Sequence, residues 1–411
     1  MPGLTRSTAD AVLKEFYLPG IRDILNNTTF LLSQIQTNSE DIEGRRAVLS
    51  IHVGRNGGIG ARAEGETLPT AGQQGYAEER VWLKYNYGRI QLTGPVIRSM
   101  GSDRGSFTRA LQSETEGVTR DLKKDVNRQL FGDGTGKIAQ AASVAGQVIT
   151  LTSPTVTQMR QLTIGSIIDV GTVANPQLRG TGLVITAVNS TAGTITVSGT
   201  VSGVAATDFI FRSGGAGTTI APGQREITGL QAQVAASGTL WNVDPAVWPD
   251  WASYVDHNNG TPRAVAEDMF IKANNEVGIR SGNEIDLWIT DAGTHRNVAK
   301  LLTSLKRFPT STELHGGYTG LDMGSVQQGN QGGQTVSMVY DADCPTGFAF
   351  GICSKRFQWY KASDWEFMEE DGAVLNRVPN VDAYEATLFL YAELATDGRN
   401  SHALVKDLIA T

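Results

Sequence analysis

Apolar residues change their spacing several times along the chain, and each change marks an expected element. RAVLSIHVG, residues 46–54, alternates apolar and polar positions as a half-buried strand does. Alternation resumes over residues 76–96, YAEERVWLKYNYGRIQLTGPV, while the intervening residues 55–75 are rich in Gly, Ala and charge. The pattern predicts a long hairpin with a polar, glycine-rich tip. Because an isolated two-stranded ribbon is marginal in water, contacts with a partner would have to stabilise it.

Residues 102–131 carry the clearest helical pattern. Apolar side chains recur there at spacings of four and seven, which places them on one stripe of a helix. These are Phe107, Leu111, Val118, Leu122, Val126 and Leu130. A helix of about 26 residues, at 1.5 Å per residue, would be a rod on the order of 39 Å long.

The six residues that follow this helix, GDGTGK, resemble a phosphate-binding loop at first sight. A P-loop needs an earlier Gly and a Ser or Thr after the Lys, and it follows a strand. Phe131 and Ile138 occupy those two positions, and here a helix precedes the glycines. We therefore expect a helix-terminating turn, in which glycines supply positive φ and an aspartate accepts the turn hydrogen bond. Its residues are Gly132, Asp133, Gly134 and Gly136.

The chain after residue 139 divides by composition. From about residue 140 to 215 charge nearly vanishes, and short alternating runs of Thr, Val and Ile predict a small β-barrel or sandwich with a hairpin turn at 189–193. Residues 224–348 mix strands with helices expected over 262–279 and 294–305, and further strands follow. Helices and strands in this order indicate an α+β protein.

The first 45 residues form an arm with little core of its own. A short helix pattern precedes Pro19-Gly20, and the apolar run 21–35 is interrupted by Asn and Thr. We expect the arm to pack against something else, such as a neighbouring chain.

Composition and charge narrow the function classes. The 411 residues are 40% hydrophobic and 19% charged, as in a globular protein that can hold two or three domains. A net charge of -7 argues against a dedicated nucleic-acid binder, since phosphate affinity needs clustered Lys and Arg. Cys344 and Cys353 are too few for a disulfide framework or a zinc site, so we expect buried free thiols. Neither a membrane span nor a signal peptide is evident, and we expect assembly in a reducing cytoplasm.

No set of residues converges on a reaction. The five histidines are scattered, no nucleophile elbow occurs, and Asp341, Asp343 and Cys344 adjoin a Pro-Thr-Gly turn rather than forming a metal motif. The acidic run 364–371 is expected to be a solvated strand end. We therefore expect no catalytic, cofactor-binding or metal residues and no enzyme activity.

The order of the expected elements along the chain resembles that of a known protein family. A leading arm, a glycine-tipped hairpin and a long helix ending in NRQLFGDGTG, followed by α/β and closing strands, resemble the tailed-bacteriophage major capsid protein of Hong Kong 97-type fold. Family members run from the G-D-G-T-G turn almost directly into a segment matched here by Ile227-Thr228-Gly229-Leu230. The intervening β-rich stretch is therefore similar to an insertion domain. The implied divisions are an N-terminal arm (1–45), an E-loop (46–97), a P-domain spine helix (98–138), an inserted β-barrel domain (139–218), an A-domain (219–348), and P-domain strands with a C-terminal segment (349–411).

The resemblance implies a shell protein that assembles with itself into hexamers and pentamers around a phage genome, made in the host cytoplasm and resident in the virion. It implies a portal, a decoration or cement protein, and weak contacts with packaged double-stranded DNA, for which Lys123-Lys124 and Arg128 are the basic candidates. No long charged segment precedes the arm, so a separate scaffolding protein or the arm itself would guide assembly. Two alternatives stay open at this point, an encapsulin-like compartment and, more distantly, a carbohydrate-active enzyme.

Inter-subunit contacts follow from the same resemblance. The E-loop would lie over a neighbour's P-domain and offer ion pairs, and the arm would clamp another neighbour. The residues implied are Phe16, Tyr17, Leu18, Arg62, Glu64, Glu66, Arg80 and Lys84.

Overall fold

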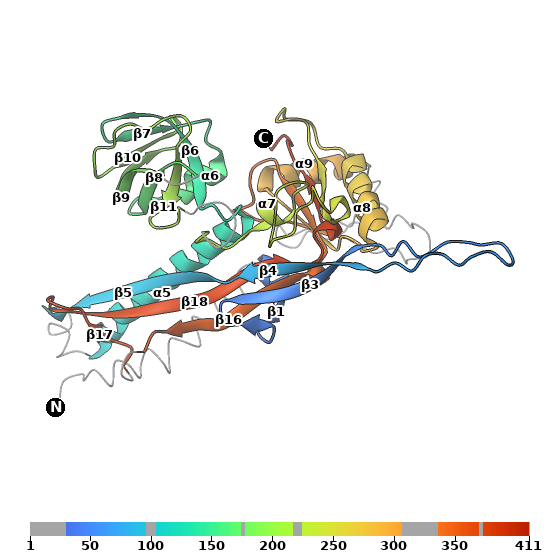
Figure 1. Cartoon of the computed structure of the whole chain (residues 1–411). Coiled ribbons are helices and arrows are strands. Elements are labelled where there is room, and N and C mark those ends of the chain that lie inside the picture. Colours follow the sequence, from blue (N-terminus) through green and yellow to red (C-terminus); the bar gives the residue numbers. More distant parts are fainter. Residues whose placement is uncertain are drawn as a thin grey trace, which may run out of the picture.

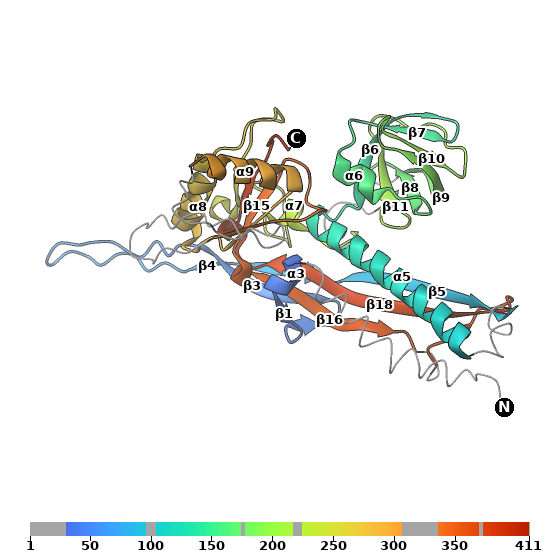
Figure 2. The ribbon, with the colours of Figure 1, turned by 180° about the vertical axis from the view of Figure 1, so that it is seen from behind.

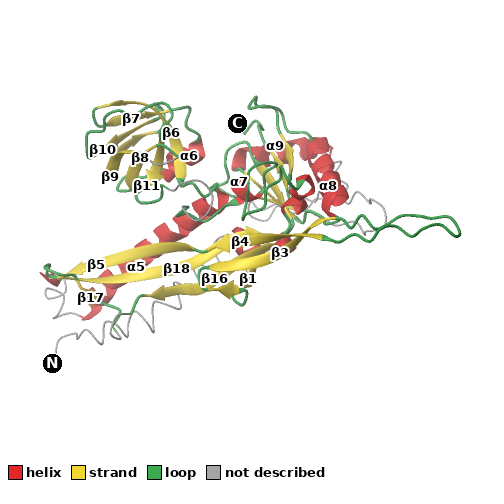
Figure 3. Cartoon of the chain, viewed as in Figure 1, coloured by secondary structure: helices red, strands yellow, loops and turns green. Residues whose placement is uncertain are grey.

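The structure, a computed structural model, describes residues 30–95, 104–173, 177–216, 224–305, 336–369 and 373–410. Within these ranges the strands form three open sheets and one closed barrel, with helices beside them (Figures 1 and 3). The mixed helix and strand content agrees with the α+β class expected from the sequence.

A long sheet and a long helix form the backbone of the molecule. β18 (Ala383–Thr396) pairs antiparallel with β5 (Lys84–Thr93) on one side and with β16 (Phe357–Phe367) on the other. α5 (Arg104–Phe131) lies along this sheet, and its 28 residues correspond to about 42 Å (Figure 2).

Gly88 of β5 allows the helix to approach the sheet closely. A Cβ atom at Gly88 would come within 2.5 Å of Leu122 Cδ1 and 2.9 Å of Val118 Cγ1. On the predicted helical stripe, Val126 and Leu130 are buried, and Val118 and Leu122 are half-buried. The side chains of Phe107 and Leu111 lie outside the described part of the chain.

The predicted hairpin is present, with one correction. β3 (Arg46–Gly54) pairs with β4 (Gly75–Trp82) from Arg46↔Trp82 to Gly54↔Gly75, and residues 55–74 project away from the body (Figure 1). The sequence predicted one continuous second strand over 76–96. Instead the chain changes partner at Leu83, whose buried side chain joins a core cluster with Trp241, and continues as β5 against β18. Both halves alternate in the same way, so the pattern alone does not reveal the change of partner.

A second sheet has the order β12-β19-β15-β13-β14 and adjoins two helices. The expected boundary at residue 349 lies inside this sheet, because β15 (Ala349–Ile352) pairs with both β13 and β19 (Ala403–Val405). The first helix, α8, begins at Glu267 rather than at residue 262. The other members are β12 (Tyr254–Asp256), β13 (Leu287–Thr290), β14 (Ser337–Tyr340), α8 (Glu267–Ser281) and α9 (Ala292–Leu305).

Residues 137–212 form a barrel that closes in the order β10-β7-β6-β11-β8-β9 around its own apolar core. The turn expected at 189–193 joins β9 to β10, with Asn189 Oδ1 accepting from Ala192 N at 3.0 Å. A short helix, α6 (Val156–Gln161), begins with a capping box that the sequence analysis missed. The strands are β6 (Lys137–Ala145), β7 (Val148–Leu151), β8 (Ile167–Gly171), β9 (Leu178–Asn189), β10 (Thr194–Val197) and β11 (Phe209–Arg212).

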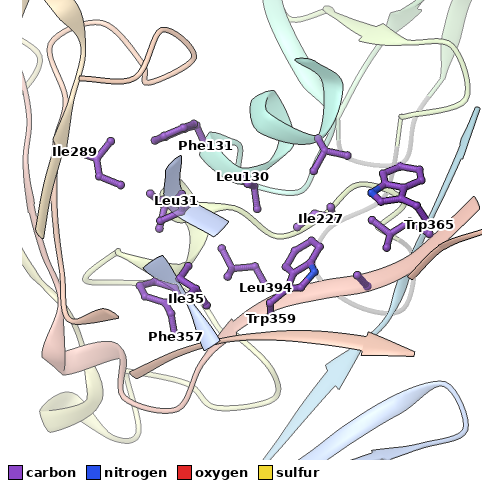
Figure 4. Packing of buried hydrophobic residues seen from close by; sticks show 14 of the residues in the cluster. Leu31, Ile35, Leu130, Phe131, Ile227, Ile289, Phe357, Trp359, Trp365 and Leu394 are labelled. Carbon is purple, nitrogen blue, oxygen red and sulfur yellow. The ribbon is translucent and has the colours of Figure 1, made fainter. Parts of the chain in front are cut away.

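The largest core cluster joins α5 to the long sheet of β18, to the second sheet of β15 and to the start of the described chain (Figure 4). Leu31 and Ile35 are buried in it, and β1 (Gln36–Asn38) pairs in parallel with β16. The arm was expected to pack against something else, such as a neighbouring chain, and residues 30–38 pack against the body of their own subunit, whereas Phe16, Tyr17 and Leu18 lie outside the described residues. Cys344 and Cys353 are buried free thiols, as predicted. The remaining elements are α3 (Phe30–Gln34), β2 (Ile42–Glu43), α7 (Leu230–Gln233), β17 (Asn376–Arg377) and the 3-10 turns Pro249–Trp251, Ser354–Arg356 and Arg399–Ser401.

Candidate assembly surfaces

The side chain of Asn56 holds the tip of the hairpin together. Asn56 donates from Nδ2 to Gly72 O at 3.1 Å and accepts from Gly58 N at 2.7 Å, which ties the two arms of the tip together. Ile59 and Leu68 are nevertheless 67% and 80% exposed. The tip therefore presents apolar side chains that the described part of the chain does not cover.

Three of the charged residues expected to bind a neighbour make contacts within the hairpin itself. Arg62 donates to Thr67 O at 3.0 Å, and Glu66 accepts from Ala63 N at 3.0 Å. Arg80 pairs with Glu78 of the same strand at 2.8 Å. Glu64 is exposed at the end of the tip. Contacts of these residues with a second chain remain a proposal.

Lys84 departs from the expectation. Its ammonium group is buried inside the subunit, 3.9 Å from Glu393 Oε2, and donates to Gln224 O at 3.2 Å. Burial raises the pKa of Glu393 to about 8, although Lys84 acts in the opposite direction. Lys84 thus joins β5, β18 and the segment after the barrel, and it is not available to a neighbour.

Four aromatic rings gather on the long sheet. Tyr85 and Tyr87 of β5 lie opposite Tyr391 and Phe389 of β18. The ring centroids of Tyr85 and Phe389 each lie 4.9 Å from that of Tyr391. A hydrogen bond with Tyr391 raises the pKa of Tyr87 to about 12. We call these four residues the aromatic face.

The aromatic face points away from α5. Gly88 faces the helix, and side chains alternate along a strand, so Tyr85 and Tyr87 point to the opposite side of the sheet. They are 45% and 53% exposed. Exposed aromatic rings are typical of protein interfaces, where Tyr supplies a large contact area.

The turn after α5 ends the helix and holds no phosphate cradle. Gly134 and Gly136 have φ of 77° and 79°, and Asp133 Oδ1 accepts from Thr135 N at 3.1 Å. Gly132 N donates to Gln129 O at 3.0 Å. Lys137 does not point into an open loop, because its ammonium group lies 2.5 Å from Asp133 Oδ2.

A buried charge network, which the sequence analysis missed, fixes the end of α5. Arg128 donates to both oxygens of Glu226, at 2.9 and 2.7 Å, and also to Asp125. Burial acts to raise the pKa of Asp125, yet Arg128 and Arg212 together hold it below its ordinary value. Arg128 is therefore not a surface residue that could touch DNA. Its partner Glu226 lies 98 positions away, so local spacing gave no signal.

The segment that follows the barrel packs directly on this helix end. A Cβ atom at Gly229 would lie 2.3 to 2.6 Å from the carbonyl oxygens of Gln129, Leu130 and Gly132. Only glycine fits at this distance. The sequence signal was the Ile227-Thr228-Gly229-Leu230 match noted above.

The other residues considered as candidate metal ligands make contacts that hold the fold together. Asn127 Nδ2 donates to Asp341 and to Asp343, at 2.9 and 2.8 Å, and Arg160 pairs with Asp343. Among the described residues, no group of three or more His, Cys, Asp or Glu side chains is arranged to hold a metal ion. No helix in the described ranges is long and apolar enough to span a membrane.

Comparison with known proteins yields structural likeness without sequence likeness. No family model and no curated protein matches the chain. The capsid of cyanophage A-1(L) matches 92% of this chain and 93% of its own, with a TM-score of 0.55 and 13% identity. The capsid of a native GTA particle covers 92% and 90% with a TM-score of 0.48 and 10% identity. The capsid of Myoviridae phage XM1 covers 92% and 91%, with a TM-score of 0.44 and 8% identity.

The cyanophage match covers nearly the whole length of both chains. It agrees with the resemblance drawn from the order of parts in the sequence. The chain has the fold of a tailed-phage capsid protein.

Proposed function

We propose that this chain is the major capsid protein of a tailed phage, a structural subunit that assembles with its own copies into the head shell. The observation that carries the proposal is the projecting hairpin, which leaves Ile59 and Leu68 uncovered on a chain with the fold of a capsid protein. A shell subunit needs repeated interfaces rather than a catalytic pocket, because weak contacts multiplied over closed symmetry give a stable particle.

In this proposal the hairpin is the E-loop, and it lies over the long sheet of a neighbouring copy. The aromatic face is the surface that receives it, since that face is exposed and carries large rings in fixed positions. The apolar tip residues would supply buried area, and Arg62, Glu64, Glu66 and Arg80 would contribute ion pairs of less than about 1 kcal/mol each while exposed. Residues 16–18 would contact another neighbour.

The sheet pairing supports a revised division of the chain. β15 and β19 pair within the sheet of β13, so residues 349–352 and 403–405 are assigned to the A-domain. β1 pairs with β16, so residues 36–38 are assigned to the P-domain. The barrel would be an insertion between the helix turn and Gly229. A scaffolding protein, a portal, a cement protein and weakly held double-stranded DNA would be the partners, and the net charge of -7 fits a lining that does not grip DNA.

A hairpin replacement tests the proposal. Gly54 and Gly75 are register partners, so residues 55–74 can be replaced by Asn-Gly, which closes a two-residue turn. We expect a folded subunit that no longer forms closed shells. The matched control is Lys272→Gln, which keeps the tip and changes one exposed charge on α8, outside the proposed contacts. Normal particles from the shortened hairpin would refute the E-loop assignment.

A further inference from the structure

The inward face of the hairpin carries a single charged residue, Glu79. β3 and β4 pair in antiparallel register, so their side chains divide into two sets on opposite faces of the ribbon. The inward set packs on the core cluster that contains Trp241, and its members are Ala47, Leu49, Ile51, Ala77, Glu79 and Val81. The other charged or titratable residues of the two strands lie in the outward set: Arg46, His52, Tyr76, Glu78 and Arg80.

The carboxyl group of Glu79 is completely buried and receives no hydrogen bond within the described part of the chain. The residue is 0% exposed, and neither Oε1 nor Oε2 has a partner. Its register partner is Leu49, and Val81 lies beside it on the same face of β4. An ionised carboxylate in such surroundings is strongly unfavourable, whereas a neutral carboxyl group loses much less on burial.

The charged groups that act on Glu79 come from the turn after β18 and are engaged with other partners. Arg399 donates to four backbone carbonyl oxygens in residues 232–238, at 2.8 to 3.1 Å. Asp397 pairs with Arg356 at 3.2 Å. Neither residue therefore supplies a hydrogen bond to the buried carboxyl group.

These surroundings keep the carboxyl group neutral while the base of the hairpin is closed. Burial raises the pKa of Glu79 well above its ordinary value of 4.5, Asp397 raises it further, and Arg399 acts in the opposite direction. Tyr360 of β16 belongs to the same core cluster. Burial, and then Glu79, raise the pKa of the Tyr360 phenol above its ordinary value of 10.0, so this hydroxyl does not titrate near neutral pH.

We propose that Glu79 is a pH-dependent switch at the base of the hairpin: the neutral side chain stays buried, and loss of its proton releases β4 toward solvent. In the open form the carboxylate is hydrated and titrates near its ordinary pKa of 4.5. The closed form holds the proton where the open form has lost it, so closure is most favoured below pH 4.5 and weakens as pH rises toward the pKa of the buried group. Each pH unit in that window raises the ratio of open to closed forms by up to about tenfold. Glu79 would act in this way in a free subunit or in a shell, because all of these groups belong to one chain.

Amide hydrogen exchange in the full-length chain tests the switch. Glu79→Gln keeps the size of the side chain and cannot ionise. Glu78→Gln is the matched control, because Glu78 lies next to it on β4, points outward and pairs with Arg80 at the surface. Exchange of peptides that cover residues 76–83 is followed from pH 5 to pH 8 and corrected for intrinsic rates. We expect opening in the wild type, relative to Glu79→Gln, to increase by up to about tenfold per pH unit, and Glu78→Gln to follow the wild type.

Glu79→Met is a second neutral variant, in which an apolar side chain of similar length replaces the carboxyl group. It should show the same weak pH dependence as Glu79→Gln. A ratio of wild-type to variant opening that stays constant with pH would overturn the switch. Loss of the pH dependence in Glu78→Gln would assign the titrating group to the surface and overturn it too. Failure of both neutral variants to fold would have the same consequence, because an uncharged side chain of this size must fit the site.

Discussion

Acidification should loosen the joint between the long sheet of β18 and the second sheet of β15 through one buried histidine, His402. Cys353 N donates to its Nδ1 at 3.2 Å, so the proton of the neutral ring is on Nε2, which donates to Thr396 Oγ1 at 2.7 Å. The Phe357 ring packs on the imidazole with centroids 4.3 Å apart. Burial, with a smaller contribution from Arg356, lowers the pKa of His402 from 6.5 to about 3.

The sign and the size of the pH effect on the free energy of unfolding follow from this pKa shift. Unfolded His402 takes up a proton below pH 6.5 and the folded residue does not, so its contribution to stability is complete above pH 6.5 and is lost as pH falls toward 3. Each pH unit in that window costs about 1.4 kcal/mol, which gives about 2.7 kcal/mol at pH 4.5. That is a large share of the roughly 5–15 kcal/mol that stabilises a typical domain.

His402→Gln isolates the effect, because a Gln amide can accept from Cys353 N and donate to Thr396 without titrating. Burial raises the pKa of Glu79 and of Glu393, and these groups favour the folded state on acidification, so the wild type and the variant must be compared. The assay is amide hydrogen exchange of peptides around Cys353 and Thr396 at pH 7 and pH 4.5, corrected for intrinsic rates. We expect extra opening at pH 4.5 in the wild type only. An equal change in the variant would refute the reasoning.

Further variants test the packing at the end of α5. Arg128→Ala leaves the Glu226 carboxylate buried without its bidentate partner, so urea unfolding should show a loss of about 3–5 kcal/mol in the free energy of unfolding. The control, Arg89→Ala at an exposed ion pair, should lose less than about 1 kcal/mol. Equal losses in the two variants would contradict the buried network. Gly229→Ala drives a methyl group into three carbonyl oxygens and should cost more than about 3 kcal/mol or abolish folding. Its control, Gly117→Ala at a position of α5 with open space around it, should stabilise by up to about 1 kcal/mol, and thermal melts of both variants would expose an error if the order reversed.

Local sequence patterns predicted the helices and strands well. They could not predict which distant strands pair with one another. The hairpin, the long helix and its glycine turn depend on neighbouring residues, so spacing and glycine placement were sufficient. The change of partner at Leu83 and the place of β15 depend on which strand lies beside another, and period-2 alternation is the same in both sheets.

The charged residues show the same limit. Lys84 lies on a strand rich in exposed polar positions, which favoured a surface role, yet Glu393 and Gln224 O enclose it from distant parts of the chain. Arg128 looked like part of a basic helix face until Glu226 was found against it. The sequence did not predict the aromatic face for a similar reason, because its four rings come from two strands that are adjacent only in the folded sheet.

Electron microscopy of the purified full-length chain tests the central claim most directly. If the hairpin and the aromatic face complete their burial against other copies, the expressed protein should form closed shells of uniform size built from this one polypeptide. A preparation that contains only compact monomers at all concentrations, with residues 55–74 protected from protease by their own subunit, would contradict the account.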